Sequence, residues 1–225
     1  PVRCPSQSMS QAMVSAIHKA KEDGDTLGGI IEVVALNLPP GLGSHAHWKR
    51  RLDSRLGAAL LSIPAIKGLE IGPAFENARL PGTQAHDPIR KLDDGNLRPE
   101  PRTSHLLTRP SNRAGGLEGG ITTGQPLHIR VAMKPIATTL TPQPTVDLAD
   151  GAETTTQYER SDVCPVPRAV PILEAMTAYV LAYALLEKLG GDSLAEILPR
   201  YQTLRRAALS DLPMDDHPHT WWPDD

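Results

Sequence analysis

The chain has 225 residues, with 23 lysines and arginines against 26 aspartates and glutamates, which gives a net charge of -3. A nucleic-acid-binding protein needs a clustered basic excess, so this balance argues against one. Hydrophobic residues make up 40% of the chain, and we find no apolar run near the roughly 20 residues of a membrane-spanning helix. Two cysteines, Cys4 and Cys164, are too few for a disulfide scaffold and suit a reducing compartment.

The first third of the chain predicts two helices and two strands. Apolar residues at helical spacing from Met9 to Ala20 indicate a helix that Ser8 or Ser10 caps and that ends at Gly24. Residues 29–38 are dense in β-branched side chains and predict a strand, which two prolines then end. An amphipathic helix over 52–63 and a short strand over 67–72 follow.

The rest of the chain is less regular. Residues 74–108 are polar and proline-punctuated, which predicts a long excursion with at most a hairpin. Residues 128–136 alternate like a strand, and the longest helix starts near Pro171 and ends at Gly190. Helices and strands mix without strict βαβ alternation, which favours an α+β fold. We expect one domain over residues 1–210 and a loosely ordered tail over 211–225.

Residues 111–124 are the most unusual segment, with five glycines in the ten positions from Gly115 to Gly124. Glycine has no Cβ, so its backbone can lie directly against a flat or anionic ligand. The segment is not a P-loop, because no lysine followed by serine or threonine comes after the glycines. Two interpretations stay open: a ligand-binding loop, and a glycine-rich hairpin or tight loop with no ligand.

Two other segments carry groups suited to an anion. Residues 134–139 close a strand with one cation and two hydroxyls, which can hold a phosphate, although a solvated strand end has the same pattern. Arg160 and Asp162 precede the longest helix. The arginine could clamp a phosphate while the aspartate moves a proton, or the two could form a surface pair.

The remaining candidate sites are weak. The pairs His45 with His47 and His217 with His219 lack further ligands at useful spacing, so we expect no metal site. Cys164 has no evident base beside it, and a buried structural thiol is the better interpretation. The chain has no Gly-x-Ser-x-Gly motif for a serine nucleophile.

Three blocks of residues together resemble the chorismate synthase family. The first comprises residues 1–5, 24–29, 39–43 and 62–68, the second residues 111–120 with Lys134 and Pro135, and the third residues 160–164 and 167–176. One block alone is suggestive, whereas three in the family's order are highly specific. The blocks span residues 1 to about 190.

This resemblance implies a lyase of the shikimate pathway, a carbon-oxygen lyase acting on phosphate. The family eliminates phosphate in a 1,4-elimination from 5-enolpyruvylshikimate 3-phosphate to give chorismate, and it depends on reduced FMN. The resemblance also implies a cytoplasmic homotetramer, whose fold is an α+β sandwich of antiparallel sheets around helices. We expect neither nucleic acid nor a membrane as a partner.

The family's site residues carry over position by position. The resemblance makes Asp162 the catalytic residue that handles a proton near the flavin. It gives Arg160 a place close to both the flavin and the substrate phosphate. The positions that match FMN contacts are Pro64, Ala65, Gly119, Lys134, Pro135, Ile136, Ala137, Thr138 and Arg160.

The chain also departs from the family. Ser161 and Val163 stand where the family often has histidine and proline, so any role of that histidine lapses. The family's N-terminal portion, with two histidines in acid roles and most substrate-binding arginines, has no counterpart here. The chain therefore resembles the C-terminal portion of the enzyme. Two alternatives are a non-catalytic flavin- or phosphate-binding module and a structural fragment with no ligand.

Overall fold

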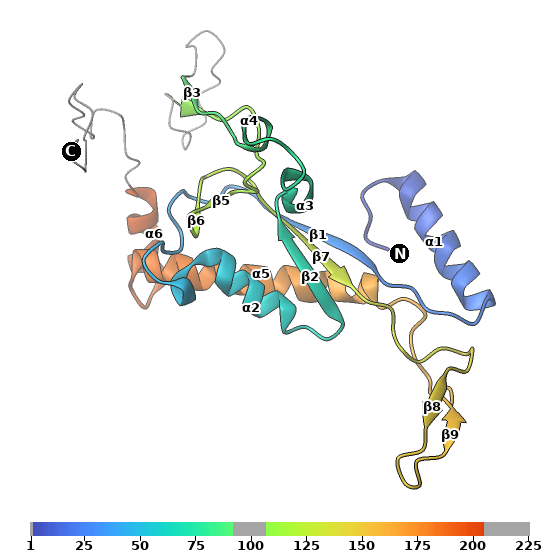
Figure 1. Cartoon of the computed structure of the whole chain (residues 1–225). Helices are drawn as coiled ribbons and strands as arrows, with labels where there is room; N and C mark the ends of the chain where they lie inside the picture. Colours follow the sequence, from blue (N-terminus) through green and yellow to red (C-terminus); the bar gives the residue numbers. More distant parts are fainter. Residues whose placement is uncertain (1, 92–106, 205–225) are drawn as a thin grey trace, which may run out of the picture. The chain divides into compact units, whose positions relative to one another are not determined.

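The computed structural model describes residues 2–91 and 107–204, which fall into two compact units (Figure 1). The larger unit comprises Pro1–His86 and Asn112–Gly190, and the smaller comprises Asp87–Ser111 and Gly191–Asp225. The expected tail over 211–225 lies outside the described residues, and one domain over 1–210 stays a prediction.

The larger unit is built on a three-stranded antiparallel sheet with the strand order β1-β7-β2. The three strands are β1 (Gly29–Ala35), β7 (Leu127–Met133) and β2 (Ile66–Ile71). Each confirms a strand expected from the sequence, within three residues at either end. β7 lies in the middle although it comes last in the chain, so the sheet joins segments about 60 and 100 residues apart.

Alternation along the strands gives the sheet two different faces. Ile31 and Val33 of β1 are buried and lie opposite Val131 and Ile129 of β7. The residues between them point the other way, and Glu32 there lies opposite Arg130. Because successive side chains of a strand alternate, the register that pairs the buried residues also gathers the charged ones on the second face.

Helices α2 (Leu52–Leu61) and α5 (Val166–Leu189) cover the apolar face. Leu56 and Leu60 of α2 and Leu173 of α5 are fully buried and join the strands in one core. Leucine at positions 52, 56 and 60 recurs every helical turn, which is why one face of α2 is continuously apolar. Mixed helices and antiparallel strands confirm an α+β fold. A second sheet that would complete a sandwich is not among the described residues.

Helix α5 is largely apolar around its circumference, yet the residues that the structure describes bury only one of its faces. Its exposed face carries Ile172, Tyr179, Tyr183 and Leu186, each between 47% and 70% exposed. By length and mean hydropathy, 1.7 over an 18-residue window, α5 is long and apolar enough to cross a membrane. The sequence analysis predicted this helix but not its length and apolarity as a possible membrane span, because polar residues interrupt its apolar runs. Core helices meet the same criteria, so the absence of a membrane partner stays a prediction.

The other elements of the larger unit lie around this core. Ser6 caps helix α1 (Gln7–Glu22), in place of the expected Ser8 or Ser10. The expected excursion contains two short helices, which the sequence did not indicate, α3 (Ala74–Asn77) and α4 (Gly82–Ala85). The remaining elements of this unit are η1 (Trp48–Arg50) and the ribbons of β5 (Leu117–Glu118) with β6 (Ile121–Thr122) and of β8 (Pro144–Val146) with β9 (Glu153–Thr155).

The smaller unit contains little regular structure among its described residues. β3 (Arg90–Lys91) pairs with β4 (Leu107–Thr108), which agrees with a hairpin in the excursion. Helix α6 (Leu194–Gln202) is capped by Ser193, whose hydroxyl accepts a hydrogen bond from the backbone N–H of Glu196.

Candidate functional site

Hydrogen bonds to backbone carbonyls bring most of the predicted site residues to one end of the sheet. Lys134, directly after β7, donates its N–H to the carbonyl of Ala65 at 2.9 Å. The Ser161 hydroxyl donates to the carbonyl of Thr138 at 3.1 Å. The segments 64–65, 134–138 and 160–162 are far apart in the sequence, so this arrangement is a property of the fold.

Ala65 has an unusual backbone conformation at this point. Its φ of 67° lies in the left-handed region, where a residue with a Cβ is uncommon. Its carbonyl receives the N–H of Lys134, so the turn that leads into β2 also fixes the end of β7. Strain of this kind persists only where surrounding contacts hold it in place, and it concentrates at functional sites.

The side chains at this end are accessible. Lys134, Pro135 and Ala137 are exposed, while Ile136 and Thr138 are half-buried. Pro64 and Arg160 are also exposed. An exposed ammonium and guanidinium near half-buried hydroxyls can bind an anion without first breaking a buried contact.

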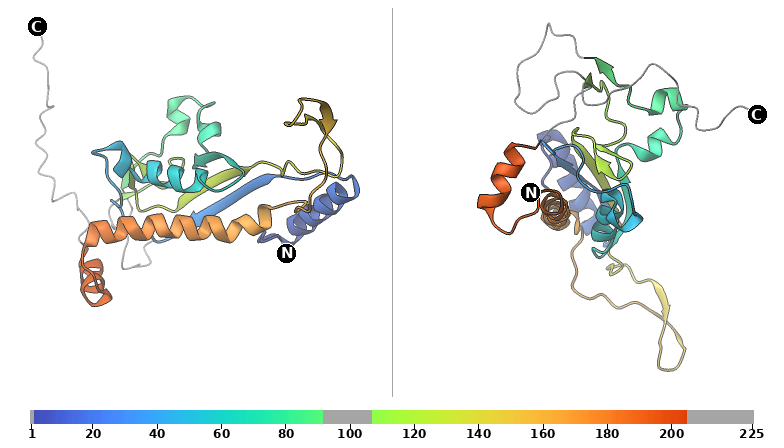
Figure 2. Two further views of the ribbon diagram at one scale, coloured as in Figure 1. Left: turned by 90° about the horizontal axis from the view of Figure 1, so that it is seen from below. Right: turned by 90° about the vertical axis from the view of Figure 1, so that its left-hand side faces the viewer.

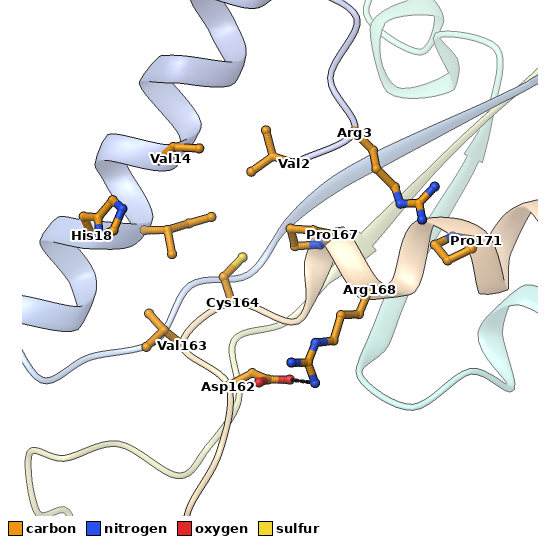
Figure 3. A pocket seen from close by; sticks show the side chains of 11 residues that line it. Val2, Arg3, Val14, His18, Asp162, Val163, Cys164, Pro167, Arg168 and Pro171 are labelled. Carbon is orange, nitrogen blue, oxygen red and sulfur yellow. Dashed lines mark ion pairs between the residues drawn. The ribbon is translucent and has the colours of Figure 1, made fainter.

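Asp162 lines an open cleft of about 680 Å³ between α1 and the start of α5 (Figure 3). Its carboxylate forms an ion pair with Arg168 at 2.9 Å, rather than with the neighbouring Arg160. The cleft is also lined by Arg3, His18 and Cys164. Cys164 is half-buried there as a free thiol. No group of three or more His, Cys, Asp and Glu that could hold a metal occurs in residues 2–91 and 107–204.

Gly119 lies away from the other predicted site residues. It is in the turn of the β5–β6 hairpin, and neighbouring Gly116 packs against Pro126 and Leu127 at the start of β7. Lys134 follows the opposite end of β7, and seven residues of strand span roughly 23 Å. One copy of the chain therefore does not bring Gly119 beside Lys134.

The glycines of the segment are largely explained by the fold itself. Gly119 and Gly120 have φ of 60° and 86°, as a two-residue type I′ turn requires. A Cβ on Gly115 would overlap the backbone of Gly72, and one on Gly116 the backbone of Pro126. Only open space faces Gly119, where no atom lies within 4 Å of the position that a Cβ would take. A hairpin and close packing thus account for these glycines, open space adjoins Gly119, and whether the segment binds a ligand stays a prediction.

Comparison with known proteins identifies the family. The sequence profile described as chorismate synthase matches residues 1–186. The chain belongs to the chorismate synthase family. The chorismate synthase of Streptomyces avermitilis is 53% identical over 196 residues, which cover 87% of this chain and 47% of that protein. The chorismate synthase of Moorella thermoacetica is 50% identical over 206 residues, covering 92% and 51%.

A solved structure agrees with the sequence comparison. The crystal structure of a chorismate synthase superimposes with a TM-score of 0.70 at 44% identity and covers 89% of this chain and 49% of that chain. The chain thus spans about half the length of the relatives it matches, as the resemblance of a C-terminal portion implied.

Sequence reasoning missed three residues that line the cleft with Asp162. Arg168 pairs with Asp162, and Arg3 and His18 come from the N-terminal segment and α1. Arg3 and Arg168 had one signal each, their places in the first and third family blocks. Nothing local in the sequence indicates His18, because α1 meets residues 162–171 only in the folded chain.

Proposed function

We propose that this chain forms one half of a chorismate synthase, a lyase of the shikimate pathway. The reaction is the 1,4-elimination of phosphate from 5-enolpyruvylshikimate 3-phosphate to give chorismate, with reduced FMN. The observation that supports this most is the convergence of residues 64–65, 134–138 and 160–162 at one end of the sheet. The two relatives compared above, both named chorismate synthase, do not favour a non-catalytic binding module.

The residues at the sheet end suit a phosphate-bearing flavin. Lys134 offers an exposed ammonium, and Thr138 lies four residues further along the same segment. Pro64 and Ala65 offer a short apolar surface beside them. Gly119 does not fit the same flavin in one copy, because β7 is longer than a flavin ring system. Reduced FMN, when bound, would supply an electron-rich ring to a reaction that has no net redox change.

Two residues have separate tasks in this proposal. Asp162 accepts the ring proton, and the electrons of the C–H bond form a new double bond. The ring's existing double bond shifts by one position, and the bond between carbon and the phosphate oxygen breaks with its electrons leaving on the phosphate. Arg168 holds that carboxylate in place at 2.9 Å. Arg160, exposed two residues earlier, binds the departing phosphate by charge-assisted hydrogen bonds.

In this proposal, the part of a full-length chorismate synthase that this chain does not match completes the site and the fold. The missing half would supply the acid groups and further anion-binding arginines. Helix α5, apolar all round and bare on the side of Tyr179 and Tyr183, would pack against a second antiparallel sheet and become the middle of a sandwich. We further propose that the complete enzyme is a cytoplasmic homotetramer.

A chimera tests the proposed function. The chain is joined behind the part of the Streptomyces avermitilis chorismate synthase that it does not match, and activity is measured anaerobically with reduced FMN. The chimera should turn over substrate and the 225-residue chain alone should not, because electrostatic stabilisation of the leaving phosphate is incomplete. An inactive, folded chimera that still binds FMN would favour the binding-module alternative.

Two substitutions in the chimera separate the proposed roles. Asp162→Asn should lower kcat roughly 100-fold or more with little change in KM, because the base is lost while the shape is kept. Arg160→Ala should instead raise KM, because it removes about 1.5–3 kcal/mol of substrate-binding free energy. Asp150→Asn, in the β8–β9 loop, is the control and should change neither constant. A full kcat in Asp162→Asn would refute the assignment.

A further inference from the structure

The turn between α1 and β1, residues 24–28, lies in the first family block but has no task in the proposed reaction. It leads from the end of α1 at Glu22 into β1 at Gly29. The left view of Figure 2 shows this turn beside the start of α5. It therefore lies at the end of the sheet where the expected site residues gather, and it contacts two of their segments.

The first of these is the segment expected to contact FMN, residues 134–138. Thr26, only 8% exposed, donates its hydroxyl hydrogen to the carbonyl of Ile136 at 2.6 Å. The N–H groups of Leu140 and Thr141, just after the segment, donate to the carbonyl of Gly24 at 3.0 and 3.2 Å. The FMN segment belongs to no helix or strand, so hydrogen bonds to this turn fix its backbone where a sheet ladder does not.

Gly28 brings the turn into direct contact with the beginning of the same segment. A Cβ on Gly28 would overlap the carbonyl oxygen of Met133 and would come within 3 Å of backbone atoms of Lys134 and Pro135. Any residue larger than glycine would therefore push the turn and the FMN segment apart. Glycine at position 28 allows the two backbones to pack against each other.

The second segment in contact with the turn carries Asp162. The N–H of Leu27 donates to the carbonyl of Val163 at 2.8 Å. The hydroxyl of Ser161 joins this segment to Thr138 of the FMN segment. The turn, the FMN segment and the Asp162 segment are thus joined pairwise by hydrogen bonds, which fixes the three backbones against one another.

We propose that the turn of residues 24–28 positions the FMN segment against Asp162, and that Thr26 is the positioning residue. Its hydroxyl binds the carbonyl of Ile136, the middle residue of the FMN segment. Because Thr26 is buried, water does not readily replace its hydroxyl as the donor. The contacts that carry this inference all lie within the chain, but the inference rests on the proposed function, since it gives the turn a task in binding FMN.

Two substitutions of Thr26 in the chimera described above test the proposal. Thr26→Val keeps the shape of the side chain and removes the hydroxyl, whereas Thr26→Ser keeps the hydroxyl. Thr26→Val should weaken the binding of reduced FMN roughly fivefold to tenfold in anaerobic calorimetry, because the binding-competent segment is less populated. Without FMN, the amides of Leu140 and Thr141 should exchange hydrogen about tenfold faster. Thr26→Ser should stay within about twofold of the parent in both measurements.

Gly28→Ala tests the turn without changing the Thr26 side chain. Its Cβ would displace the turn from the backbone of Met133, so both measurements should change at least as much as in Thr26→Val. Unchanged FMN affinity in Gly28→Ala would contradict the close packing of the two backbones.

Thr177→Val is the matched control in the core. Thr177 is 2% exposed, and its hydroxyl has no hydrogen-bond partner among the residues that the structure describes, so its removal should change neither measurement. Parent-like FMN affinity in Thr26→Val, or a loss of affinity with unchanged amide exchange, overturns the proposal. An equal loss in Thr26→Ser overturns it as well, because the hydroxyl is then not the cause. A parent chimera that binds no FMN overturns the proposed function itself, and this inference with it.

Discussion

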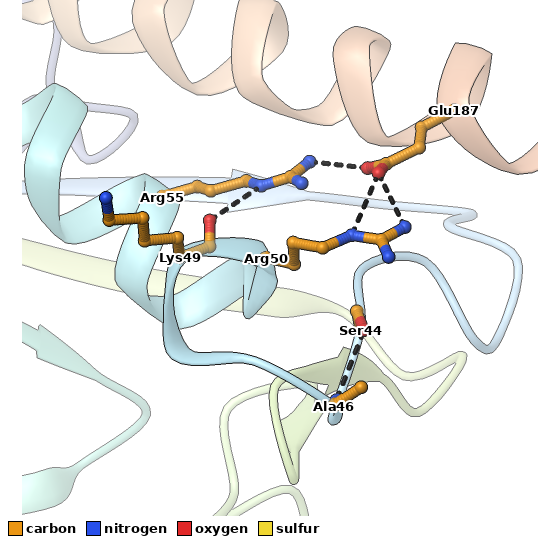
Figure 4. A network of polar contacts seen from close by, with 6 residues as sticks. All are labelled: Ser44, Ala46, Lys49, Arg50, Arg55 and Glu187. Atoms are coloured by element: carbon orange, nitrogen blue, oxygen red, sulfur yellow. Dashed lines mark hydrogen bonds and ion pairs between the residues drawn. The ribbon is translucent and has the colours of Figure 1, made fainter.

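Glu187 joins α5 to the segment before α2 and provides a sharp test of the packing in the larger unit. Its carboxylate accepts hydrogen bonds from Arg50 at 2.8 and 3.2 Å and from Arg55 at 2.7 Å (Figure 4). The Arg55 side chain is 17% exposed and Glu187 32%, while Arg50 is 56% exposed and more strongly screened by water. Glu187→Gln should therefore cost about 1–2 kcal/mol of the free energy of unfolding, mostly through Arg55.

The assay is chemical denaturation at neutral pH, supported by a fall in Tm of about 3–6 °C. The control is Glu196→Gln, whose pair with Arg200 is 3.7 Å long and half exposed and should cost less than about 0.5 kcal/mol. Equal losses in the two variants would refute the reasoning, because they would show that burial and double pairing at Glu187 add nothing.

The loss of stability in Glu187→Gln should depend on pH, and its direction follows from the pKa of Glu187. The hydrogen bond from Arg55, with help from Arg50, holds the pKa of Glu187 below its ordinary value of 4.5 against the opposing effect of burial. A lowered folded-state pKa contributes stability that is present above the unfolded value and lost as pH falls through the folded value. The difference between parent and Glu187→Gln should be full at pH 7 and should shrink below about pH 4.5.

Three further substitutions test the backbone and the core. Gly119→Asn should stay within about 0.5 kcal/mol of the parent, whereas Gly119→Val should lose about 1–2 kcal/mol at its positive φ. Equal urea midpoints would contradict the I′ turn. Gly115→Ala should lose about 2 kcal/mol or more, since its Cβ would overlap Gly72; an unchanged midpoint is the contrary result. Leu173→Ala, in the core, should lose about 2–5 kcal/mol, and a smaller loss would argue against its full burial.

The local sequence located the longer helices and the three strands of the central sheet, but not all their ends and not the short elements such as α3 and α4. The long helix begins at Val166, five residues before the Pro171 that suggested its start. Pro167 lies in the first turn, where the N–H groups have no intrahelical acceptor, whereas Pro171 lies inside the helix and removes one of its hydrogen bonds. Prolines therefore indicate that a helix begins nearby, but they do not fix its first residue.

At the candidate site, the sequence likewise indicated the residues but not the contacts between them. The family blocks indicated residues 64–65, 134–138 and 160–162 by composition and order, but only the register of β7 against β2 brings Lys134 to Ala65. The pairing of Asp162 with Arg168 likewise follows from the turn into α5 and not from the nearer Arg160. Neither contact has a local signal.

The sequence by itself determined the family, the α+β class and the periodic elements, because side-chain alternation, caps and breakers act within a few residues. The tertiary structure decided which end of β7 each segment meets, and that the glycines of residues 115–120 serve close packing and a tight turn. These facts depend on contacts between residues far apart in the chain, whose pairing is set by the burial of the whole core and by no short segment alone.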